Sequence, residues 1–136
     1  KGELACRQYQ VDGARGQARA GFPLVTGAGL AQLHASRARG DNETTARLNA
    51  LLAIISQLDD TCVLSRGGEA ALLALQTGAA QVLAAGGAAT AAGSQALLAL
   101  EAVALARGVS PGGAADLLAA TLFLDRLTEG DAHGNA

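Results

Sequence analysis

The chain has 136 residues, enough for one domain with a modest core, and half of its residues are hydrophobic while only 2% are aromatic. Its net charge of −2 excludes the broad basic field that nucleic-acid binding needs, and the absence of an uninterrupted apolar run of about 18 residues argues against a membrane span. A core of Ala, Leu and Val favours closely packed helices. The two cysteines, Cys6 and Cys62, indicate reduced thiols rather than a disulfide framework. We therefore predict an all-α, cytoplasmic protein.

Residues 11–23 predict a loop that approaches a ligand or another backbone closely, because glycines occur in it at high density. A solvated surface loop is the alternative, and it is favoured for Arg19. The glycines and arginines of this segment are Gly13, Arg15, Gly16, Arg19 and Gly21.

Two helices are predicted next. The first covers 23–36, where an initial proline suits the first turn, although Gly27 and Gly29 should make the helix irregular. The second covers 43–58, with Asn42 as part of its cap and with apolar residues recurring on one face.

An unusually polar stretch, residues 58–68, follows between two apolar helical patterns. It opens with Asp59, Asp60 and Thr61, whose oxygens are the ligand type that Mg²⁺ takes while it stays bound to phosphates. Carboxylates at the C-terminal end of a helix oppose its dipole, and such a local conflict tends to mark function. The alternative is an ordinary junction in which Asp60 or Thr61 caps the next helix.

The second part of this stretch predicts a phosphate contact. Arg66 is followed by Gly67 and Gly68. A guanidinium group matches phosphate oxygens, and glycines let backbone N–H groups approach them. Because the next helix is predicted to start near Gly68 and Glu69, its positive end would face the same anion.

Helices are then predicted over 69–85 and 88–106, separated by a glycine pair that stops the first of them. Glu101 lies among the apolar residues of the second helix. It is either exposed on the polar face, which the pattern favours, or a buried acid.

The second unusual stretch covers 108–116. Ser110 is a suitable N-cap, and Pro111 fits the first helical position. A plain cap does not need Gly112 and Gly113, which cost helix stability unless the backbone must come close to something. Asp116 then lies in the first turn, where the dipole stabilises its charge.

A last helix over 114–127 carries leucines on nearly all sides, which indicates a central, buried helix. The whole chain is thus predicted to be a compact all-α bundle of about five or six helices with Gly-rich connecting loops. No internal repeat is apparent.

Four motifs in this order resemble the C-terminal half of triphosphoribosyl-dephospho-CoA synthases. The resemblance spans residues 13–127, and Cys62 and Ser65 look more like the malonate-decarboxylase branch than the citrate-lyase branch. It implies that residues 1–136 form a single helical domain of a longer enzyme, inactive alone. The motifs are Gly13-Ala14-Arg15-Gly16, Gly21-Phe22-Pro23, Asp60-Thr61 with Arg66-Gly67-Gly68, and Ser110-Pro111-Gly112-Gly113-Ala114-Ala115-Asp116-Leu117-Leu118.

The resemblance implies transfer of the 5-triphosphoribosyl group of ATP to the ribose 2′-OH of 3′-dephospho-CoA, with release of adenine. The product would be the prosthetic-group precursor for the acyl carrier protein of malonate decarboxylase or citrate lyase. The implied partners are ATP, 3′-dephospho-CoA and a missing N-terminal half, and apolar surface left open would favour a homo-oligomer. Mg²⁺ is expected to bind the triphosphate and help to hold it in place.

The same resemblance implies roles for particular residues. Asp59, Asp60 and Asp116 are the catalytic candidates, and Asp60 and Asp116 are also metal candidates. We expect Asp60, Arg66, Ser110 and Asp116 to converge on one cleft. The candidates for holding the nucleotide are Arg15, Gly16, Thr61, Arg66, Gly67, Gly68, Ser110, Gly112 and Gly113.

Two other functions stay open at this point. The chain could be a non-catalytic helical interaction module whose glycines are packing points, or another nucleotide-using helical enzyme. Stabilisation by ATP separates the first of these from an enzyme, because an interaction module should show none.

Overall fold

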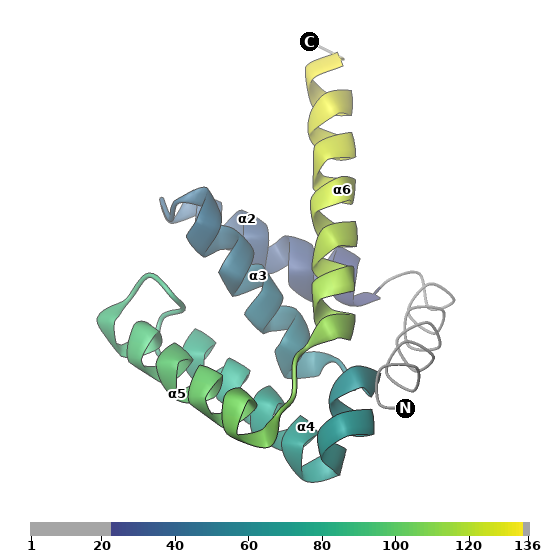
Figure 1. Ribbon diagram of the computed structural model, residues 1–136. Helices are drawn as coiled ribbons and strands as arrows, with labels where there is room; N and C mark the ends of the chain where they lie inside the picture. Colours follow the sequence, from purple (N-terminus) through teal and green to yellow (C-terminus); the bar gives the residue numbers. More distant parts are fainter. Residues whose placement is uncertain (1–22, 135–136) are drawn as a thin grey trace.

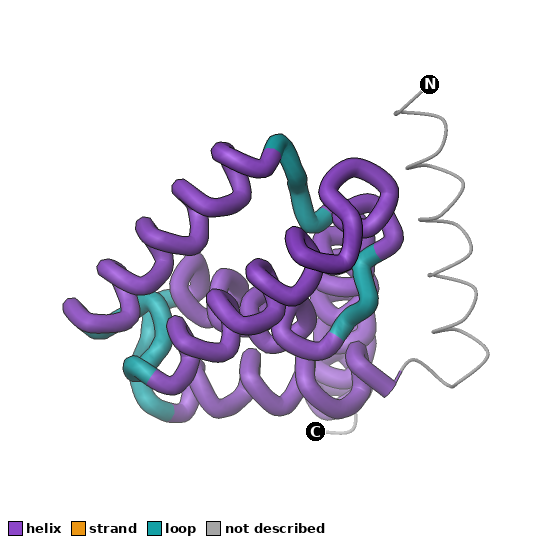
Figure 2. The backbone as a smooth tube through the Cα atoms, turned by 90° about the horizontal axis from the view of Figure 1, so that it is seen from below, coloured by secondary structure: helices purple, strands orange, loops and turns teal. Residues whose placement is uncertain are grey.

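The computed structural model describes residues 23–134, and this part of the chain folds into helices without a strand (Figure 1). Short loops join the helices (Figure 2). The all-α prediction is therefore confirmed. The elements are the π-helix η1 (Leu24–Gly29) and the α-helices α2 (Leu30–Ala38), α3 (Glu43–Gln57), α4 (Thr61–Ala84), α5 (Ala91–Arg107) and α6 (Gly112–Gly134).

The predicted irregularity of the first helix is confirmed, since η1 precedes the regular turns of α2. Gly29 explains it in part. A Cβ atom at this position would lie 2.7 Å from the Thr121 side-chain oxygen, so glycine lets η1 approach α6 closely.

The central helix of the fold is α3, which packs against η1, α2, α4 and α6. It begins at the predicted cap, where the Asn42 side chain accepts a hydrogen bond of 2.8 Å from the Thr45 backbone N–H. Leu52 and Ile54 are completely or almost completely buried. The prediction that the last helix would be central is wrong: Phe123 and Leu127 of α6 are largely exposed, because only one side of α6 meets the body of the bundle.

The stretch predicted as a loop before residue 68 is helical instead. α4 begins at Thr61 because Asp60 caps it and because Cys62 and Val63 are buried against the core. The helix then bends at Gly68, whose φ of 75° and ψ of −172° interrupt the helical conformation. A helical segment does begin after Gly68 as predicted, but a helical turn rather than a loop precedes it.

α4 and α5 form an antiparallel hairpin. Gly78 of α4 allows the hairpin to close, since a Cβ atom there would lie 2.7 Å from a methyl carbon of Leu100. At the turn, Gly86 and Gly87 have positive φ, as the predicted stop requires. Thr90 caps α5 by accepting a hydrogen bond from the Gly93 backbone N–H at 2.9 Å.

A buried amide, Asn49 of α3, ties the tip of this hairpin to the rest of the fold. Its Oδ1 accepts a hydrogen bond of 2.8 Å from the Ala88 backbone N–H, and its Nδ2 donates to the Ser36 hydroxyl at 3.1 Å. Asn49 is fully buried, and without it the Ala88 backbone N–H would lose its acceptor.

Two further expectations concern the environment of the protein. Cys62 is disulfide-bonded, so the expectation of a reduced thiol is wrong at this position. In the described part of the chain, no helix taken alone has the length and apolarity to cross a membrane; the bent pair of α3 and α4 passes this test only when joined. The cytoplasmic location stays a prediction.

Gly68 offers a direct test of the bend in α4. Gly68→Ala is expected to lower the free energy of unfolding by about 1–2 kcal/mol, because its φ and ψ lie in a region that residues with a Cβ atom rarely adopt. No neighbouring atom lies within 4 Å of an added Cβ, so the cost is conformational rather than steric. Urea denaturation measures it. Gly27→Ala, equally open but without positive φ, is the control and should not destabilise.

Candidate functional site at the junction of α4 and α6

The centre of the candidate site is the carboxylate of Asp60, which is 4% exposed. One oxygen accepts a hydrogen bond of 3.0 Å from the Cys62 backbone N–H, and the other accepts one of 3.1 Å from the Ala114 backbone N–H. A single side chain thus caps α4 and holds the first turn of α6, and both helix dipoles stabilise its negative charge. The ordinary alternative, in which Asp60 is a helix cap, is therefore confirmed.

The second glycine of the pair that begins α6 has its explanation in the same carboxylate. A Cβ atom on Gly113 would lie 3.1 Å from the Asp60 Oδ1 atom. The prediction that the backbone must come close to something at this point is confirmed, and the neighbour is Asp60. Ser110 is not the side-chain cap that the pattern predicted, because Asp60 takes that place from the other end of the junction.

The two unusual stretches of the sequence meet at this junction. Besides the contact between Asp60 and Ala114, a Cβ atom on Gly67 would lie 2.7 Å from a methyl group of Val109. Gly67 therefore serves the close packing of the two stretches. Ser110, the next residue after Val109, is exposed beside them.

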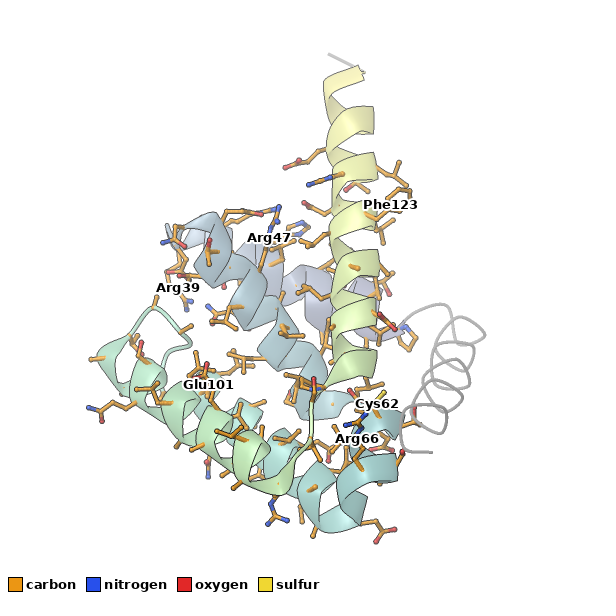
Figure 3. All side chains as sticks on the ribbon, in the orientation of Figure 1. Arg39, Arg47, Cys62, Arg66, Glu101 and Phe123 are labelled. Atoms are coloured by element: carbon orange, nitrogen blue, oxygen red, sulfur yellow. The ribbon has the colours of Figure 1, made fainter. Side chains whose placement is uncertain are left out.

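Arg66 is the cation of this junction. Figure 3 shows it in the first turns of α4, next to the segment that joins α5 to α6. Its side chain is exposed and makes no hydrogen bond or ion pair with another described residue. A guanidinium group without a counter-ion is suited to bind an external anion.

The other predicted residues have varied surroundings. Asp59 is exposed and accepts a hydrogen bond of 3.1 Å from the Gln76 side chain, which also donates to the Leu58 carbonyl. Thr61 is half-buried, and Asp116 is exposed on the first turns of α6. Arg15 and Gly16 lie outside the described residues. Convergence of the predicted side chains on one cleft stays a prediction, although the segments that carry them are neighbours.

The residues fit a metal only in a limited way. Within residues 23–134, no group of three or more His, Cys, Asp or Glu side chains could hold a metal ion. Asp60 is buried and its two oxygens are already occupied by backbone N–H groups. Asp59 and Asp116 keep exposed carboxylates, and Mg²⁺ bound to phosphates needs only one or two of these.

Sequence reasoning missed a second polar cluster, which lies where α2 and α3 meet the middle of α6. Asp125 is 2% exposed and accepts a hydrogen bond of 2.8 Å from Arg37, while its other oxygen lies 3.1 Å from the His34 Nε2 atom. Arg37 also binds Glu43 through two nitrogens, and Arg47 binds Glu43 at 3.1 Å. The cluster borders a polar cavity of about 300 Å³.

The charges of this cluster stabilise one another. Hydrogen bonds from Arg37, and then from Arg47, lower the pKa of Glu43 to about 2 against the effect of burial. Burial raises the pKa of Asp125, but the hydrogen bonds from Arg37 and His34 outweigh it and the net pKa is lowered. The spacing of Glu43 and Arg47 on one helix was a visible signal; the role of Asp125 was not, because its partners are far away in the sequence.

Comparison with known proteins agrees with the motifs. Residues 1–135 match the model of the family described as CitG, ATP:dephospho-CoA triphosphoribosyl transferase. The chain, a helical domain that brings the two unusual stretches together, therefore belongs to this family. The family prediction is confirmed.

Relatives are similar over almost the whole chain. It is 60% identical to a 2-(5''-triphosphoribosyl)-3'-dephosphocoenzyme-A synthase of Klebsiella pneumoniae, with 93% of this chain and 45% of that protein covered. A probable synthase of the same name from Stutzerimonas stutzeri is also 60% identical, with 93% and 44% covered. The chain thus spans less than half the length of these relatives. A search of the solved structures gives no match.

Proposed function

We propose that this chain forms part of an enzyme that transfers the 5-triphosphoribosyl group of ATP to the ribose 2′-OH of 3′-dephospho-CoA. The observation that carries the proposal is the family match over residues 1–135, supported by 60% identity to a synthase of that name. In this reaction the 2′-oxygen bonds to C1′ of the ATP ribose and loses its proton. The bond from C1′ to adenine breaks, and adenine leaves with a proton.

The junction of α4 and α6 is the proposed place for the triphosphate of ATP. Asp60 already accepts hydrogen bonds from the backbone N–H groups of Cys62 and Ala114, so fewer N–H donors at these helix ends are available to a phosphate. Arg66 supplies positive charge without a described counter-ion, and Ser110 is exposed next to Val109, which packs on Gly67. We assign the phosphate contact to these two side chains, with Arg66 as the main one.

The carboxylates have distinct proposed roles. A transfer at C1′ needs a base for the 2′-OH and negative charge near the oxocarbenium-like centre. Asp59 and Asp116 are exposed and can approach a substrate, and either fits a Mg²⁺ ion shared with the phosphates, whose positive charge would shield the triphosphate. Asp60 remains a catalytic candidate, but its buried position makes it first a residue that positions α4 against α6.

Partners of the chain belong to the same proposal. The relatives are longer, and we propose that the rest of such a protein completes the site, so that the present residues do not catalyse transfer alone. Large exposed hydrophobic side chains on α4 and α5, such as Leu73 and Leu98, favour contact with that part or with a second copy. We propose that the product is the prosthetic-group precursor of malonate decarboxylase rather than of citrate lyase, because Cys62 and Ser65 look more like the malonate-decarboxylase branch of the family.

The proposal is tested by following adenine. The full-length protein is incubated with ATP, Mg²⁺ and 3′-dephospho-CoA, and adenine is measured by chromatography. Release that requires both nucleotides supports the transferase. No release, together with no stabilisation by ATP, would favour a helical interaction module instead.

Arg66→Ala tests the phosphate contact. We expect about tenfold weaker binding of ATP, because a charged hydrogen-bond donor to phosphate is lost. The free energy of unfolding should change by less than about 0.5 kcal/mol, since Arg66 is exposed. Calorimetric titration and thermal denaturation measure the two effects. Arg126→Ala, an exposed arginine near the middle of α6, is the control. A lower melting temperature with unchanged affinity would show that Arg66 is structural.

A further inference from the structure

An apolar groove lies between α3 and α5. Both helices pack against α4, but they hardly touch each other. The space between them is a pocket of about 170 Å³, and α4 forms its floor. In Figure 1 these helices diverge from the bend of α4.

The lining of the groove has almost no charge. Aliphatic side chains from all three helices form it, among them Leu48 and Ile55 of α3 and Leu97 of α5. Glu101 is the one ionisable side chain among the described residues that line it, and in Figure 3 it extends from α5 toward α3. A site of this kind suits a slender, uncharged chain rather than a phosphate.

One end of the groove reaches the candidate phosphate site. Pro111 belongs to the lining, and it directly precedes the glycine pair whose second member, Gly113, packs on Asp60. Ser110, proposed above to contact phosphate, is the residue before Pro111. A ligand with its apolar arm in the groove would therefore have its other end close to the place proposed for ATP, as two substrates that react with each other require.

We infer that this groove holds the pantetheine arm of 3′-dephospho-CoA, an inference that rests on the proposed function. Dephospho-CoA is ADP extended by pantetheine, a narrow chain that carries two amides and a thiol but no charge. ATP has no comparable part. The aliphatic lining matches the methyl and methylene groups of the arm, and the Glu101 carboxylate accepts a hydrogen bond from an amide N–H. The diphosphate then lies at the Pro111 end of the groove, next to the place proposed for ATP.

The difference in affinity between dephospho-CoA and ADP measures the contribution of the pantetheine arm to binding. The full-length protein is titrated with ATP, ADP and 3′-dephospho-CoA, and dephospho-CoA should bind about tenfold more tightly than ADP. Ala104 lines the groove, so Ala104→Leu should remove this difference while the affinities for ATP and ADP stay unchanged. Ala106→Leu, on an exposed position of the same helix, is the matched control.

A second variant avoids the risk of a packing defect. Glu101 is exposed, and Glu101→Ala should weaken dephospho-CoA about fivefold without affecting ADP or the melting temperature.

The outcomes separate the two claims. If ATP binds but dephospho-CoA binds no better than ADP, the groove does not hold the arm and the proposed function stands. The same holds if the two groove variants change stability or self-association but not affinity, because the groove then packs against protein. If wild-type protein binds neither ATP nor dephospho-CoA, the proposed function fails first and this inference with it.

Discussion

Replacing Asp60 with alanine is expected to lower the free energy of unfolding by about 2–4 kcal/mol, because two buried backbone N–H groups lose their acceptor at once. These are the N–H groups of Cys62 and Ala114, which belong to different helices. The start of α6 would also lose its attachment to α4. Urea denaturation followed by circular dichroism gives the value.

Asp59→Ala is the matched control, since Asp59 is exposed and, among the described residues, binds a partly buried glutamine side chain. It should cost less than about 0.5 kcal/mol. Asp60→Asn separates structure from catalysis: the amide keeps one acceptor but turns a donor toward the other N–H group. We expect severely reduced adenine release from it. Normal release by the fraction that stays folded would move the catalytic role to Asp59 or Asp116.

Asp125→Ala is expected to lower the free energy of unfolding at pH 7 by about 2–3 kcal/mol. Asp125 is buried, and its loss leaves the Arg37 guanidinium and the His34 ring without their partner on α6. The cost stays below that of an isolated buried pair because Arg37 keeps Glu43. A change below about 0.5 kcal/mol would mean that the apolar contacts of α6 suffice.

The same cluster predicts acid sensitivity. The pKa of Glu43 is lowered from 4.5 to about 2, and the pKa of Asp125 is lowered from 3.8. A carboxylate with a lowered pKa in the folded state stabilises the fold at pH values above its unfolded pKa, and this contribution is lost as the pH falls through the folded pKa. Stability should therefore fall between about pH 5 and pH 2, and less steeply in Asp125→Ala. Denaturation curves at pH 7 and pH 3 compare the two proteins.

Local signals in the sequence predicted most of the helices. Asn42 caps α3 as expected, and the positive φ of Gly87 explains why the hairpin turns there. These features depend on neighbours within a few residues, and a pattern of residue types is enough to find them.

The site depends on contacts that no local pattern records. Asp60 looked like a functional acid because it follows a helix, and its acceptor role at Ala114 became visible only when a segment 54 residues away came into place. The role of Asp125 was missed for the same reason, because its partners Arg37 and His34 lie far away in the sequence. The groove arises from the relative placement of three helices, so the pattern of no single helix predicts it.

The placement of Asn49 and Asp60 also bears on how a ligand would enter. Asn49 holds the tip of the α4–α5 hairpin against α3 through Ala88, and Asp60, at the start of α4, holds the start of α6 through Ala114. The tip of the hairpin therefore cannot swing away from α3, nor the start of α6 from α4, unless a hydrogen bond breaks. We therefore expect the groove to keep its shape before anything binds, so that a ligand that enters it loses its own freedom but does not have to order the protein. Association should then follow a single kinetic phase whose rate rises linearly with ligand concentration, without a slow closing step.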